Sequence, residues 1–151
     1  MKFRTFELSA IATILLLMVL SIMLKGDALH IGVWYYLALP LTLTGLCALF
    51  RPAPLFLLGV NIAISLSIIS YLSINWFSAR PDGMLGLGHA FALPGALAGA
   101  LAGAAVARHR RISAPLTLLL LGTAGTGAGF IVAQLVVCNS LLYCGWASRL
   151  F

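Results

Sequence analysis

Four side chains with the chemistry of acids, bases and metal ligands lie close to the ends of apolar segments: Asp27, His30, Asp82 and His89. Two carboxylates and two imidazoles on one face of a membrane could bind a divalent metal ion or transfer protons. Asp27 and His30 share one short connection between apolar segments. Asp82 and His89 lie near a later connection, at the start of the fourth apolar segment. The alternative is a set of solvated loop residues. We expect that alternative, so no catalytic residue, metal ion or cofactor is predicted.

The three cysteines match no metal-binding or redox motif. Cys47 lies alone in an apolar run and is expected to pack as a small hydrophobic residue. Cys138 and Cys144 lie near the end of the sequence, and no CxxC spacing occurs. In an oxidising compartment these two could form a disulfide that closes a small loop, and two free thiols are the alternative.

Uncharged polar residues are scattered through the apolar segments. They either bond between helices or line a path for a small solute. The candidates for such a path are Asn61, Ser67, Ser70, Ser73 and Gln134, of which the serines recur every three residues. No Asp, Glu, Lys or Arg falls in the middle of an apolar segment. Ion-coupled carriers usually place an ionisable group there, so a proton-driven pump is not expected.

Small residues recur every four positions in the last two apolar segments. The glycines at this spacing are Gly95, Gly99 and Gly103 in one segment and Gly125 and Gly129 in the other. Glycines on one helix face let another helix approach closely. This face either docks a partner or packs the two segments against each other within the chain.

Five apolar segments must position these residues, at about 8–24, 31–50, 53–77, 84–107 and 114–137. Of the 151 residues, 62% are hydrophobic and 8% are charged. A soluble domain of this size could not bury so much apolar surface, which excludes a water-soluble enzyme. Each segment is close to the roughly 20 residues that cross a bilayer, where helices satisfy the backbone. We predict one all-α domain, 1–151, a polytopic bundle of transmembrane helices.

Charge counting favours five spans with the N-terminus inside and the C-terminus outside. That topology places six basic residues inside (Lys2, Arg4, Arg51, Arg108, Arg110 and Arg111) and three outside (Lys25, Arg80 and Arg149). If segment 84–107 does not span, the four-span alternative leaves four inside and five outside, against the usual bias. The net charge of +6 is therefore attributed to topology and not to nucleic-acid binding. Arg108, Arg110 and Arg111 are expected to meet lipid headgroups; an acidic partner or a nucleotide is the alternative.

In size and hydropathy the chain resembles small bacterial inner-membrane proteins, namely accessory subunits of larger complexes and immunity proteins against pore-forming toxins. The resemblance implies a non-catalytic interaction protein that binds another membrane protein, or itself, in the lipid bilayer. A small oligomeric channel or transporter is the second hypothesis. A small membrane enzyme that uses the Asp and His residues is the third.

Overall fold

Helices form most of the chain in the computed structural model, which describes residues 2–50, 52–78 and 85–140. The elements are α1 (Lys2–Lys25), α2 (Val33–Leu49), α3 (Phe56–Phe77), α4 (Leu85–His109) and α5 (Pro115–Ser140). The prediction of an all-helical chain with five helical segments is confirmed. The observed helix ends differ most from the predicted ones at the first segment, which was expected at 8–24. Helix α1 begins earlier, at Lys2, and so includes the charged residues before that segment.

Four of these helices, α1, α3, α4 and α5, are long and apolar enough to cross a membrane. They are compatible with a multi-pass membrane protein. One of these four helices is α4, which corresponds to segment 84–107, the segment that does not span in the four-span alternative. The shorter helix is instead α2, which has 17 residues and is about 26 Å long at 1.5 Å per residue.

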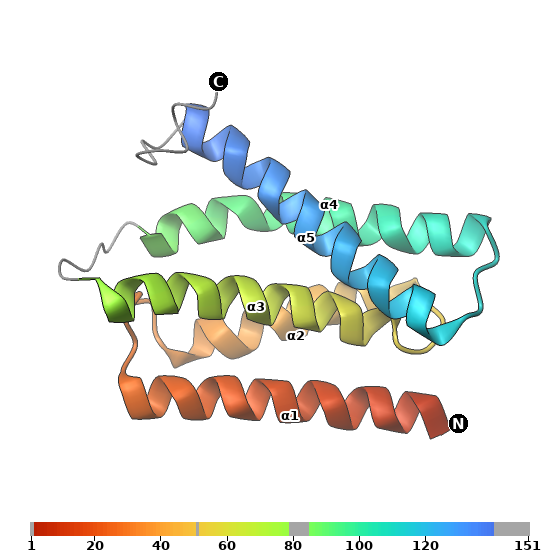
Figure 1. The fold of residues 1–151 in the computed structure, drawn as a ribbon, viewed down its shortest axis with the longest axis horizontal. Coiled ribbons are helices and arrows are strands. Elements are labelled where there is room, and N and C mark those ends of the chain that lie inside the picture. The colour runs from red at the N-terminus through yellow and green to blue at the C-terminus, as the bar shows by residue number, and fades with distance from the viewer. Residues whose placement is uncertain (1, 51, 79–84, 141–151) are drawn as a thin grey trace.

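The helices form a bundle in which each helix runs antiparallel to the one before it (Figure 1). Helix α3 contacts all four other helices, and α5 crosses α4 obliquely over the most extensive interface (Figure 1). Within the described part of the chain, α1 contacts only α2 and α3. The start of α1 and the end of α5 lie at opposite ends of the bundle (Figure 1).

Backbone contact between helices depends on glycine at two faces of α5. A Cβ atom on Gly125 would lie 2.7 Å from the carbonyl oxygen of Gly99 in α4. A Cβ atom on Gly59 of α3 would lie 2.9 Å from the backbone nitrogen of Thr123. Both distances are shorter than real Cβ contacts, so these positions admit only glycine without a shift of the helices.

The glycine face predicted from the sequence lies where α4 and α5 cross. Its members, Gly95, Gly99, Gly103, Gly125 and Gly129, each approach the opposite helix closely. Within this chain the glycines therefore pack α4 against α5, which is the alternative to docking a separate chain through the same atoms.

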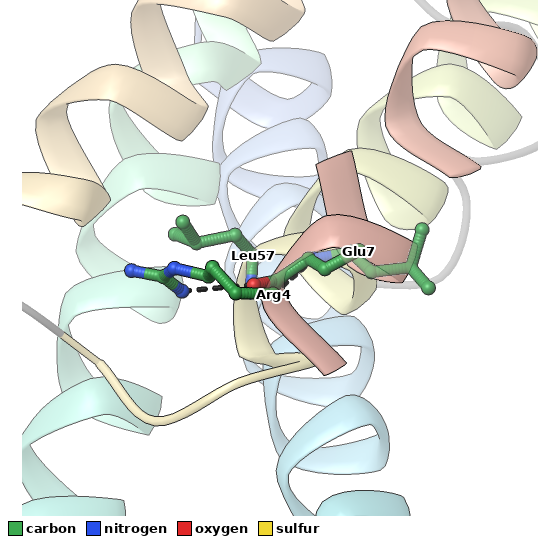
Figure 2. A network of polar contacts seen from close by, with 4 residues as sticks. Arg4, Glu7 and Leu57 are labelled. Carbon is green, nitrogen blue, oxygen red and sulfur yellow. Dashed lines mark hydrogen bonds and ion pairs between the residues drawn. The ribbon is translucent and has the colours of Figure 1, made fainter. Parts of the chain in front are cut away.

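The start of α3 is capped by a side chain of α1. Its own N-cap residue, Leu55, has a left-handed backbone conformation and supplies no side-chain cap. The N–H groups of Leu57 and Leu58 donate instead to Oε1 of Glu7, at 3.0 and 3.3 Å (Figure 2). Arg4 donates to the other carboxylate oxygen at 2.8 Å. Glu7 is 0% exposed, so one carboxylate satisfies two backbone donors that have no water to bond.

The other end of α3 holds the connection between α1 and α2. The side-chain amide of Asn75 donates to the carbonyl oxygen of Ala28 at 2.9 Å. The indole N–H of Trp76 donates to the carbonyl oxygen of Gly26 at 3.0 Å. The ammonium group of Lys25 lies 5.1 Å from the centre of the Trp76 ring, within the range of a cation–π interaction. Helix α1 is thus fastened to α3 at both ends.

Glu7→Ala is expected to lower the free energy of unfolding by about 2–4 kcal/mol, because it leaves two buried N–H groups and Arg4 without their acceptor. Glu7→Gln keeps one acceptor oxygen and should cost about half as much. The measurement is unfolding in detergent micelles, followed by circular dichroism. A Glu7→Ala protein as stable as the wild type would contradict the capping role.

Candidate functional site

A fully buried histidine, His89 of α4, lies where four helices meet. The Tyr35 hydroxyl of α2 is 2.9 Å from Nδ1, and the Ser67 hydroxyl of α3 is 3.0 Å from Nε2. The rings of Tyr71 from α3 and Phe130 from α5 lie 5.0 and 5.1 Å from the imidazole, centre to centre. These five residues form what we call the His89 centre. Its exposure of 0% places the imidazole out of reach of bulk water.

The hydrogen bonds of Ser67 define how the imidazole is protonated. The Ser67 hydroxyl lies 2.8 Å from the carbonyl oxygen of Ile64 and donates its one proton there. Ser67 therefore accepts from Nε2–H of His89, and Nδ1 accepts from the Tyr35 hydroxyl. A serine nucleophile would have to donate its proton to the imidazole, which is the reverse arrangement. The His89 centre is a closed chain of hydrogen bonds around a neutral imidazole.

A cavity of about 320 Å³ lies beside the His89 centre, between α3 and α5. Ser67, Ser70, Tyr71, Thr126 and Phe130 contribute to its wall. Thr126 is fully buried, and its hydroxyl has no hydrogen-bond partner among the residues that the structure describes. An uncharged small molecule with one hydrogen-bonding group would match this mostly apolar wall.

Two of the five residues predicted to form a polar path, Ser67 and Ser70, line this cavity. Ser73 is half-buried elsewhere on α3, and Asn61 donates to a threonine hydroxyl of α2 at 3.5 Å. Gln134 donates to the sulfur atom of a cysteine on its own helix at 3.3 Å. The serines separate because three residues fall short of a 3.6-residue turn, so each step rotates the stripe by about 60°.

The two cysteines that the structure describes lie on different helices. Cys47 is a buried free thiol in α2, surrounded by apolar side chains. Cys138 is buried near the end of α5. Cys144 falls outside the described residues, so the pairing of these two cysteines stays a prediction.

Asp27 organises the connection between α1 and α2. Its carboxylate accepts hydrogen bonds from the N–H groups of Leu29 and Gly32, at 3.2 and 2.6 Å, and from the Tyr36 hydroxyl. Its carbonyl oxygen accepts from the N–H of His30 at 3.3 Å. Burial acts to raise the pKa of Asp27, but these hydrogen bonds outweigh it and lower the pKa below the ordinary value of 3.8.

The three acid–base candidates that the structure describes have separate places. Asp27 closes its own loop, His30 is exposed, and His89 bonds to Tyr35 and Ser67. Asp82 lies outside the described residues. Within residues 2–50, 52–78 and 85–140, no group of three or more His, Cys, Asp or Glu side chains could hold a metal ion.

Glu7 is a buried polar residue that the sequence analysis does not identify as a candidate. It lies directly before the first predicted apolar segment, 8–24. The available signal was a single acidic residue three positions after Arg4, at the start of that segment. This spacing brings the two side chains together on one helix face.

The fold and the site define a helical bundle in which the buried Glu7 and His89 bond to other groups of the chain, with four helices apolar enough to cross a membrane. The chain matches no protein-family model, no curated protein and no solved structure.

Ser67→Ala should lower the free energy of unfolding by about 1–3 kcal/mol, because it leaves Nε2–H of His89 without an acceptor. Ser70→Ala is the matched control, since among the described residues the exposed Ser70 hydroxyl bonds only to a carbonyl of its own helix. Its effect should stay within about 0.5 kcal/mol. Unfolding in detergent gives both values. Nitrogen-15 NMR of histidine-labelled protein should find the His89 proton on Nε2, and a proton on Nδ1 would refute the assignment.

The Asp27 hydrogen bonds predict an acid-sensitive loop. The folded chain holds the carboxyl at a lower pKa than the unfolded chain, so its contribution to stability is complete above the ordinary value of 3.8. That contribution is lost as the pH falls through the lower, folded value. Unfolding of wild type and Asp27→Asn between pH 6 and pH 3 measures it. The difference between the two proteins should shrink toward pH 3, and a constant difference would contradict the prediction.

Proposed function

We propose that the protein is a non-catalytic integral membrane protein that acts by binding a transmembrane helix of another membrane protein. Accessory subunits and protective immunity partners both work in this way. In the proposed topology all five helices span the bacterial inner membrane, with the N-terminus inside and the C-terminus outside. An odd number of antiparallel helices and the six-to-three distribution of basic residues support it.

The observation that carries the proposal is a shallow groove of about 540 Å³ along the crossing of α4 and α5. Its walls are the glycines of the crossing together with Ala98, Ala102, Val106, Ala128 and Val132. We call it the small-residue groove. Small side chains leave room for a third helix to approach closely, so that van der Waals contact replaces the hydrophobic drive that is absent in lipid.

Three ionisable side chains, Glu7, Asp27 and His89, support a role without catalysis. Glu7 caps α3, Asp27 closes its loop, and His89 has a partner on each ring nitrogen. A general base needs a free lone pair directed at a substrate, and each of these groups is engaged with the chain itself.

Ala102→Leu tests the proposal, because it fills the small-residue groove from an exposed position of α4. Ala12→Leu is the matched control, since Ala12 is exposed on α1, away from the groove. The measurement is mass spectrometry of what copurifies with the tagged protein in nanodiscs from its own host. A stoichiometric membrane partner should be retained by wild type and Ala12→Leu, and about tenfold less by Ala102→Leu.

Three outcomes would count against this proposal. One is equal retention of the partner by both variants, which places the contact elsewhere. The second is a homo-oligomer without another protein, which replaces the partner by a second copy of the chain. The third is a monomer without a partner.

A small channel or transporter is the second candidate, and the cavity between α3 and α5 favours it. The unpartnered Thr126 hydroxyl there could bind a passing solute. Solute flux into proteoliposomes, compared between wild type and Thr126→Val, distinguishes this role from helix binding.

A further inference from the structure

A second cavity, of about 550 Å³, lies at the end of the bundle where α2 and α4 end and α5 begins. Two cationic side chains, Arg108 and Arg111, form part of its wall. The remainder is largely apolar and includes Leu49, Phe50 and Leu118. Its volume lies within the roughly 300–1,000 Å³ of small-molecule sites. We call it the arginine cavity.

The end of α4 places both arginines on this wall. The N–H of Ile112 bonds to the carbonyl of Ala107 at 2.9 Å, and the N–H of Arg111 bonds to that of Arg108 at 3.2 Å. This pair of bonds is the Schellman motif, whose left-handed position is usually glycine. Here Arg111 occupies it with φ +50°, a conformation that residues with a side chain seldom adopt.

The arginine cavity has two positive charges and no carboxylate to balance them. Among the residues that the structure describes, the one ion pair joins Arg4 to Glu7 near the start of α1. Asp27 lies just after the other end of α1, in the connection to α2. Neither Arg108 nor Arg111 has an ion-pair partner within these residues. Both arginines are exposed, and an anion bound between two guanidinium groups on one cavity wall would offset their mutual repulsion.

We infer that the arginine cavity binds the phosphate-bearing headgroup of an anionic phospholipid. Guanidinium groups match phosphate oxygens with two parallel donors, and the apolar wall contacts the glycerol and the first acyl carbons. The cavity lies at the ends of helices long enough to span, which is the level of the headgroups. Basic pockets between transmembrane helices bind such headgroups in other proteins.

The structure also separates Arg110 from its two neighbours. Arg110 lines a different surface, together with Ala105, Val106 and His109. The three arginines that form one basic cluster in the sequence therefore have different environments. Arg110→Gln removes the same charge as a change at Arg108 or Arg111 and leaves the arginine cavity intact, so it serves as the matched control.

The test uses the full chain in a neutral detergent, with phosphatidylglycerol as the anionic probe and phosphatidylcholine as the zwitterionic one. Native mass spectrometry counts retained lipid, and tryptophan fluorescence follows thermal unfolding. Wild type and Arg110→Gln should retain phosphatidylglycerol in preference to phosphatidylcholine and gain thermal stability from it. Arg108→Gln and Arg111→Gln each remove one charge, as Arg110→Gln does, and each should lose at least about tenfold in apparent affinity for phosphatidylglycerol.

Equal loss in Arg108→Gln, Arg111→Gln and Arg110→Gln would overturn the site, because it would mean general attraction between the cationic protein and an anionic lipid. Absence of retained phosphatidylglycerol on the wild type would overturn it even if the two cavity variants failed to fold. Inorganic phosphate is added as a separate probe. If it alone reproduces the thermal shift in wild type, a soluble anion replaces the lipid and the lipid assignment is wrong.

Discussion

The structure depends on one constraint, that polar groups placed in an apolar environment must find their partners within the chain. The contact between Glu7 and the start of α3 satisfies this constraint at the most central helix of the bundle, α3. Helix α3 contacts every other helix, and its first N–H groups receive a carboxylate from α1 and not from the preceding loop. A negative charge at a helix N-terminus also interacts favourably with the helix dipole. The position of α1 follows from this contact.

The same constraint explains the His89 centre and the Asp27 loop. In both, a side chain that is costly to bury alone is surrounded by donors and acceptors of matching type. Four buried side-chain atoms lack a hydrogen-bond partner among the described residues, namely Asn61 Oδ1, Gln134 Oε1 and the hydroxyls of Ser65 and Thr126. Of these residues, Thr126 lines the cavity between α3 and α5, where a molecule outside the chain can bind. The arginine cavity is a different case, because its two arginines are exposed and lack an ion-pair partner among the described residues. The small-residue groove differs from them, since it lacks polar groups and offers only close approach.

The sequence allows prediction of the helices because length and apolarity are local properties. It also indicates that His89 is unusual, as a histidine just inside an apolar segment. Its partners were not predictable, because Tyr35 resembles an interfacial aromatic residue and Ser67 is one of three serines at equal spacing. Only the rotation of α3 decides which serine meets the imidazole. The role of Glu7 was not predictable for a similar reason. Its bonding partners are backbone N–H groups about 50 residues away, and every residue except proline has such a group.

That separation of 50 residues between Glu7 and Leu57 has a consequence for biosynthesis. A ribosome that adds about 5–20 residues per second makes Leu57 about 3–10 s after Glu7. During this interval the carboxylate has only Arg4 as a partner, and hydrocarbon would be a costly environment for it. The contact that caps α3 therefore forms only after both helices have been made. Of these two helices, α1 is made before α3 and waits for α3 to gain this contact.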